Sequence, residues 1–169
     1  TYAGTSGISK VSAGATLSTG ADIIAAIRAG VTKMNEDEVD TENRYRYITP
    51  TLLGLVQDMD TTKSREVLKG FAGVVEVPQS RFYTAIDLKD GTTSGEESGG
   101  FAKAEGGKEI NFMIVQKSAV MQYPKHTVNK IITPELNQTS DGWMFFYRAY
   151  GLADVYENKA AGIYLHHKA

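Results

Sequence analysis

Apolar residues along this chain follow two spacings, and these spacings predict the main elements of the fold. Residues 110–115 form a nearly continuous apolar run that is partly β-branched, with Gly106 and Gly107 before it and Tyr123 and Pro124 after it. Such a run is typical of a strand that is covered on both faces. We therefore predict that residues 110–115 are a central strand and that the other elements pack around it.

A second pattern repeats at the period of an α-helix between residues 21 and 34. One side of this predicted helix carries five apolar residues: Ile23, Ile24, Ile27, Val31 and Met34. Thr19 stands where an N-cap is expected, and Gly30, a poor helix former, indicates a close packing contact. We expect the helix to pack its apolar stripe on the sheet that contains residues 110–115.

Shorter apolar or alternating runs predict the remaining elements. Residues 45–49 alternate as a strand, and Pro50 then opens a short helix over residues 51–57. Further strands are expected at residues 73–77, 82–88, 127–133, 143–155 and 162–166. The strand at 82–88 is expected to continue the main sheet. The last two strands are expected to pair with each other in antiparallel fashion, because the polar residues between them form a turn.

Two segments lack regular apolar spacing. Residues 1–19 are rich in glycine, serine and threonine, and we expect a linker or the remnant of an arm. Residues 89–108 are glycine-rich, with Phe101 as their large apolar residue, and we expect a long flexible loop. The sequence thus predicts an α+β fold, a mixed sheet with packed helices, over residues 20–169.

Composition excludes several classes of function. The chain has 169 residues, 18 basic and 20 acidic side chains and a formal charge of −2, so its net charge does not favour nucleic acid or an anionic membrane. It has no cysteine, which excludes disulfides and thiolate sites. No apolar run reaches the ~20 residues of a membrane span. We expect no membrane partner and no sequence-specific nucleic-acid partner. The chain begins at Thr1, and we expect it to be a piece of a longer polypeptide.

Three segments invite a metal or phosphate interpretation. Residues 36–42 are strongly acidic, but they lack the alternating ligands and the central glycine of a calcium loop, so a solvated loop is the better interpretation. Asp58 and Asp60 form a weak Asp-x-Asp motif that we interpret as a capped turn. Gly107 and Lys108 lack the spacing of a phosphate-binding loop. We expect no metal and no cofactor.

The histidines and one arginine are the remaining candidates for chemistry. His166 and His167 are adjacent on a predicted strand, so they point to opposite faces and do not share one metal ion. His126 has no nearby serine or acid that would make it part of a triad. Arg148, within an aromatic run, requires a buried carboxylate or a partner chain unless it stacks on neighbouring tyrosines and reaches water, which is the simpler interpretation. We therefore expect that the protein is not an enzyme.

Five short segments follow one another along the chain in an order that is typical of a known protein family. They are residues 45–50 (YRYITP), 73–78 (GVVEVP) with Arg81 and Phe82, 110–115 (INFMIV) with Lys117, Ala119 and Val120, 148–153 (RAYGLA) and 160–163 (AAGI). In this order the chain resembles, over about residues 20–169, the C-terminal part of a tailed-phage major capsid protein. The resemblance implies the Hong Kong 97-type capsid fold, with an axial domain at the capsomer centre and final strands that return to a peripheral domain.

The resemblance also implies a function. It implies a structural virion protein of a phage or prophage, made in the bacterial host cytoplasm, that contacts copies of itself in pentamers and hexamers. The family's arm, extended hairpin loop and spine helix would precede Thr1, so we expect this chain alone to be monomeric. Two alternatives stay open: a small-ligand or carbohydrate-binding β-rich module and, less favoured, a hydrolase that uses Asp58 or His126.

Overall fold

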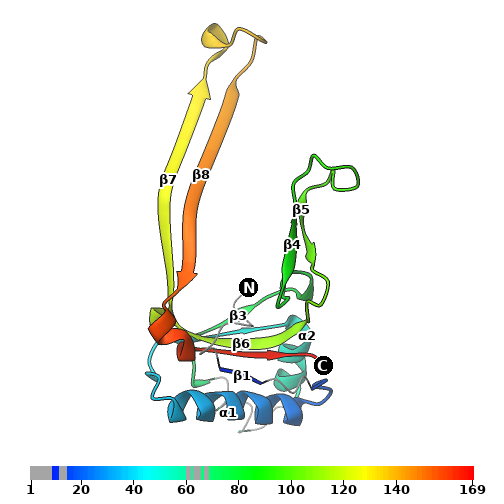
Figure 1. The fold of residues 1–169 in the computed structure, drawn as a ribbon, viewed down its shortest axis with the longest axis vertical. Helices are drawn as coiled ribbons and strands as arrows, with labels where there is room; N and C mark the ends of the chain where they lie inside the picture. The colour runs from blue at the N-terminus through cyan, green and yellow to red at the C-terminus, as the bar shows by residue number, and fades with distance from the viewer. Residues whose placement is uncertain (1–8, 12–14, 60–61, 63–65, 67–68) are drawn as a thin grey trace. The chain divides into compact units, whose positions relative to one another are not determined.

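The computed structural model describes residues 9–11, 15–59, 62, 66 and 69–169 (Figure 1). The chain divides into two compact units: unit 2 is Val120–Val155, and unit 1 comprises Thr1–Ala119 and Tyr156–Ala169. Helices and mixed sheets together make an α+β fold, as the sequence predicts.

A five-stranded sheet forms the centre of unit 1, in the order β1-β9-β6-β2-β3. These strands are β1 (Ser9–Val11), β2 (Arg44–Ile48), β3 (Gly73–Glu76), β6 (Ile110–Gln116) and β9 (Ile163–His167). β6 is antiparallel to both of its neighbours, β2 and β9, whereas the edge strands β1 and β3 run parallel to theirs. The central position predicted for residues 110–115 is confirmed.

Two helices, α1 (Gly20–Glu36) and α2 (Pro50–Gln57), cover one face of this sheet (Figure 1). The cluster buried between the helices and the sheet includes Ile23, Ile27, Met34, Phe112 and Ile114. Thr19 caps α1, since its Oγ1 accepts a hydrogen bond of 3.2 Å from the backbone N–H of Asp22. The helix, its cap and its apolar stripe agree with the sequence prediction.

A smaller apolar cluster covers the other face of the sheet. Phe82, Ile110 and Leu165 are buried there, and Tyr47 and Met113 pack against them. With α1 on one side and this cluster on the other, every residue of β6 except Met113 is buried. β6 is therefore covered on both faces, as its continuous apolar sequence predicts.

β4 (Ile86–Lys89) and β5 (Gly100–Lys103) pair with each other in a separate antiparallel hairpin. The prediction that residues 82–88 continue the main sheet is wrong, because Pro78 is followed by a 3₁₀ helix (Gln79–Arg81) that turns Phe82 into the small cluster. The expected loop at 89–108 contains β5. The turn that joins β4 to β5 ends at Gly99 and Gly100, whose φ angles of 59° and 91° favour glycine.

Unit 2 is one long hairpin of β7 (Val120–Ile132) and β8 (Met144–Val155), with a bulge between Pro124 and His126. The prediction that residues 143–155 pair with residues 162–166 is wrong, since β8 pairs with β7 whereas β9 pairs with β6 and β1.

The reason lies in the 3₁₀ helix η5 (Glu157–Gly162), which follows β8 along the chain. The N–H of Tyr156 donates to the carbonyl oxygen of Ala119 at 3.1 Å. A Cβ on Gly162 would lie 2.9 Å from the Cβ of Ala119, so the backbone passes very close to that residue. These contacts direct the chain back to the central sheet of unit 1.

Gly30 marks the close contact that the sequence predicts. A Cβ at this position would lie 2.6 Å from Cε1 of Tyr164, whose side chain is 2% exposed. Gly30→Ala is expected to destabilise the protein by about 1–3 kcal/mol through overpacking, because the gain in helix propensity of about 1 kcal/mol offsets only part of the strain. Urea unfolding followed by far-UV circular dichroism measures the change.

Gly54→Ala in α2 is the matched control, since no atom lies within 4 Å of a Cβ at that position. This variant is expected to keep the wild-type stability or to gain up to about 1 kcal/mol. Equal gains in both variants would show that α1 does not approach Tyr164 as closely as the structure indicates.

Candidate functional site

The acidic candidates do not assemble into a site. Asp58 is exposed at the C-terminus of α2, where its N–H donates to the carbonyl oxygen of Gly54 at 2.9 Å. Asp60 lies outside the described residues. In the described part of the chain, no group of three or more histidine or acidic side chains could hold a metal ion. Over the same residues, no helix is both long and apolar enough to cross a membrane.

The acidic residues 36–42 form a turn around a buried arginine. Arg44 is 2% exposed, and its guanidinium donates hydrogen bonds to the carbonyl oxygens of Val39 and Asp40 and to Oδ1 of Asn35. Lys33 pairs with Asp37 at 2.7 Å, while the other carboxylates of the run are exposed. The turn is thus a solvated loop held by Arg44, and sequence reasoning missed this arginine.

Arg46 of β2 is buried without a hydrogen-bond partner. Its side chain is 0% exposed, and none of its three nitrogens has a partner among the described residues. The ring of Phe71 lies 5.0 Å from the guanidinium carbon. Burial lowers the pKa of the Arg46 guanidinium to about 10, so the group stays charged at neutral pH. A signal for this burial existed in the sequence, because Arg46 shares its strand face with the core residue Ile48.

Replacing Arg46 with methionine tests whether the buried charge lacks a partner. Arg46→Met is expected to be neutral or to stabilise the protein by about 1–4 kcal/mol, because an apolar side chain of similar length carries no desolvation cost. The matched variant Arg44→Met is expected to destabilise by at least about 2 kcal/mol, since it leaves three oxygen acceptors unpaired. Guanidinium unfolding measures both. Equal losses in the two variants would reveal a partner for Arg46.

His166 makes a specific buried pair, and its neighbour His167 points to the other face, as the sequence predicts. His166 is 4% exposed, and its ring stacks on Phe112 with centroids 5.1 Å apart. Its Nδ1 lies 3.0 Å from Nδ2 of Asn111, which also donates to the carbonyl oxygen of Ala15 at 3.2 Å. Because an amide nitrogen only donates, Nδ1 is the acceptor of a neutral imidazole. The pair thus ties Nδ1 of His166 in β9 to Asn111 in β6.

This pair predicts acid sensitivity. Burial, together with the nearby His167, lowers the pKa of His166 below its ordinary value of 6.5. The unfolded chain then binds a proton at higher pH than the folded chain. The stability that neutral His166 contributes is therefore fully present above about pH 6.5 and is lost as the pH falls toward the lower, folded-state pKa.

We expect the free energy of unfolding to decrease from about pH 7.5 to about pH 5.5, and the decrease to be smaller in His166→Gln, which has no titrating group at this position. His126→Gln, at an exposed position of β7, is the matched control and should keep the wild-type dependence. Urea unfolding at several pH values measures it. An unchanged slope in His166→Gln would contradict the assignment.

The remaining two candidates lie in unit 2. His126 and Arg148 line a hollow of about 450 Å³ on one face of the β7–β8 hairpin, together with Lys130 and Phe146. No carboxylate and no serine lines this hollow, so His126 has no partner there for acid–base chemistry. Arg148 is exposed and pairs in register with Val128, which agrees with an arginine that reaches water.

The most prominent exposed feature of unit 2 is apolar. Tyr123, Ile131, Phe145, Tyr147 and Tyr150 are all more than half exposed, and Phe145 reaches 73%. By the strand register Ile131, Phe145 and Tyr147 lie on one face of the hairpin and Tyr123 and Tyr150 on the other. We call these five residues together the hairpin surface. A two-stranded hairpin is marginally stable in water, and large exposed apolar areas mark interaction sites. The aromatic residues at consecutive positions 145–147 were the sequence signal, because neighbours on a strand lie on opposite faces.

Comparisons with known proteins identify the fold. No family model matches the chain, and no curated protein matches it in sequence. Among solved structures, a chain of the capsid of the cyanophage P-SCSP1u is similar, with a TM-score of 0.57 and 16% identity over 95% of this chain. The match covers 53% of the cyanophage chain, so this chain spans about half the length of that protein. At this identity the similarity shows a phage capsid-like fold.

Proposed function

We propose that this chain is part of the major capsid protein of a phage or prophage, with the Hong Kong 97-type fold, and that it builds the icosahedral head. The similarity to the cyanophage capsid over 95% of the chain is the observation that carries this proposal. By the proposal the chain is the C-terminal portion of that protein. Residues 20–169 are the axial domain with returning strands, and residues 1–19 are a linker or arm remnant that adds β1 to the edge of the sheet.

The chemistry of the described residues supports a structural role. His126 faces no acid or nucleophile, Asp58 is an exposed helix end, and His166 is engaged with Asn111. Catalysis requires a nucleophile, a base and an orienting group within hydrogen-bond reach of one another. By the proposal the protein is not an enzyme and uses no cofactor. It is made in the host cytoplasm and resides in the virion.

The hairpin surface supports repeated contacts between copies. In a closed shell each copy presents the same surfaces, so exposed apolar residues of one copy are covered by a neighbour. By the proposal these contacts form the pentamers and hexamers of the full-length protein. The exposed aromatics would also suit a small-ligand or carbohydrate-binding module, which is the second candidate. A hydrolytic activity that vanished in Asp58→Ala or His126→Ala would favour the third, a hydrolase.

The association state tests the proposal. At micromolar concentration we expect a predominantly monomeric chain, with ring-like association at high concentration, because it spans about half of the cyanophage capsid chain and interfaces below ~1,000 Å² rarely hold alone. Multi-angle light scattering measures this. A stable pentamer or hexamer at micromolar concentration would contradict the expectation that this chain alone is monomeric. Failure of the full-length protein to form shells in electron micrographs would contradict the function.

A further inference from the structure

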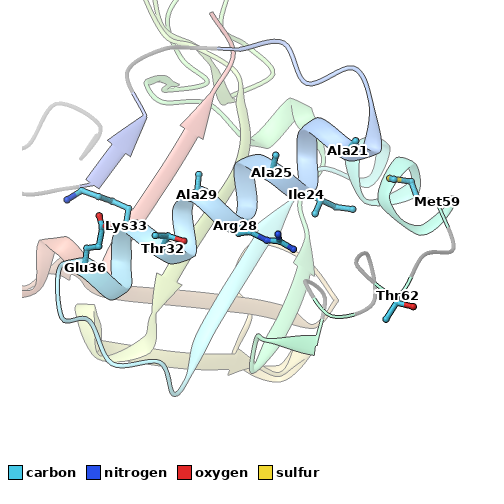
Figure 2. Close-up of a pocket in the computed structure, with 10 residues that line it drawn as sticks. All are labelled: Ala21, Ile24, Ala25, Arg28, Ala29, Thr32, Lys33, Glu36, Met59 and Thr62. Carbon is cyan, nitrogen blue, oxygen red and sulfur yellow. The ribbon is translucent and has the colours of Figure 1, made fainter.

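The outward face of α1 bears a groove of about 1110 Å³ (Figure 2), and the core residue Ile24 is among the residues that line it. Ala21, Ala25 and Ala29 recur every four residues along it, and Met59 and Thr62 contribute from the chain beyond α2. Side chains four apart lie on one face of a helix, and alanines leave room there for apolar groups from outside. The groove is thus an apolar surface of unit 1 that none of the described residues fills.

The groove carries one cation that is not neutralised. Arg28 lies on this face and is exposed, and it forms no ion pair within the described part of the chain. Lys33, further along α1, is paired with Asp37, and Glu36 is the acidic residue of the lining. An occupant with an acidic group placed next to Arg28 would match this charge.

The β4–β5 hairpin exposes apolar side chains that would complement the apolar groove. Leu88 pairs in register with Phe101, and Ile86 lies two residues away on the same face. These side chains are 79%, 38% and 42% exposed, respectively. β4 and β5 are joined to no other strand among the described residues, so the hairpin buries little apolar area within its own copy.

The tip of the same hairpin is acidic. Asp90, Glu96 and Glu97 lie in it, and each carboxylate accepts a hydrogen bond from a backbone N–H of the tip. Hydrogen bonds from Thr93 and, next, Thr92 hold the pKa of Asp90 well below its usual range, so this carboxylate is ionised. The hairpin therefore combines an exposed apolar face with a negatively charged end.

Helix α1, which bears the groove, and the β4–β5 hairpin lie on opposite sides of the central sheet of unit 1 (Figure 1). α1 packs on the face of Phe112 and Ile114, whereas Phe82, which leads into the hairpin, packs on the face of Met113. One copy does not place its own hairpin in its own groove. Two different surfaces on two copies make a heterologous contact, and such contacts repeat around a ring.

We propose that the apolar face of the β4–β5 hairpin of one copy docks in the α1 groove of a second copy, with the acidic tip beside Arg28. This inference rests on the proposed function, because it names the surfaces through which copies meet. Leu88 and Phe101 lose contact with water over the alanines of α1, which stabilises the contact. The ion pairs with Arg28 set its orientation.

The chain has no cysteine, so single cysteines report this contact directly. Ala25→Cys and Leu88→Cys proteins are mixed at the concentration where light scattering detects association, and are then oxidised. We expect the Ala25–Leu88 heterodimer as the main covalent product, on the order of tenfold above the level for Ser140→Cys mixed with Leu88→Cys. Ser140 lies in unit 2, away from both surfaces in sequence.

Charge reversal gives an independent measure that does not depend on disulfide geometry. Arg28→Glu is expected to weaken association on the order of tenfold, whereas Arg81→Glu, at another exposed arginine of unit 1, should leave it unchanged. Association without the Ala25–Leu88 product, or with equal effects of the two reversals, overturns this inference and leaves the proposed function intact. A full-length protein that never assembles overturns both.

Discussion

The burial of both faces of β6 is the constraint on which the rest of unit 1 depends. α1 covers the face of Phe112 and Ile114, and the cluster around Phe82 covers the face of Met113. The helix reaches the sheet closely because Gly30 places no Cβ against the ring of Tyr164. Any shift of α1 along or away from the sheet would open the larger cluster to water. Helix, sheet and small cluster are therefore expected to unfold as one cooperative core.

This core admits polar groups, and each is accommodated in a different way. Arg44 has three oxygen acceptors, and His166 has the amide of Asn111. Arg46 has the ring of Phe71 beneath its charge and no hydrogen bond from a described residue. A buried charge without hydrogen bonds costs several kcal/mol on general grounds, roughly the difference between a stable and a marginal domain. At Arg46, therefore, the fold buries a charged side chain that its local surroundings do not stabilise with hydrogen bonds.

Sequence periodicity predicted two kinds of element: a helix that buries one face and a strand that buries both. It identified β6, α1, the cap at Thr19 and the contact at Gly30, because each leaves a local mark in the residue pattern. It did not predict which strands pair, since β8 and β9 are separated by contacts of Tyr156 and Gly162 with Ala119, residues far apart in the sequence. Nor did it predict the buried arginines, because a charged side chain is expected outside unless its neighbours on the strand face are examined. Of the proposed interaction surfaces, the consecutive aromatic residues of β8 can be recognised in the sequence, and the groove on α1 cannot.

Both hairpins carry exposed apolar residues, which stay in contact with water in the free chain. Leu88 of β4 and Phe145 of β8 are 79% and 73% exposed, respectively. In an isolated copy these groups bury little apolar area, and exposed apolar groups of this size are typical of interaction sites. By the proposed function a shell covers them many times over with small contacts. Small contacts dissociate readily, so a misplaced copy leaves before its neighbours trap it. Stability then belongs to the closed assembly, while the core around β6 alone keeps each copy folded before it joins.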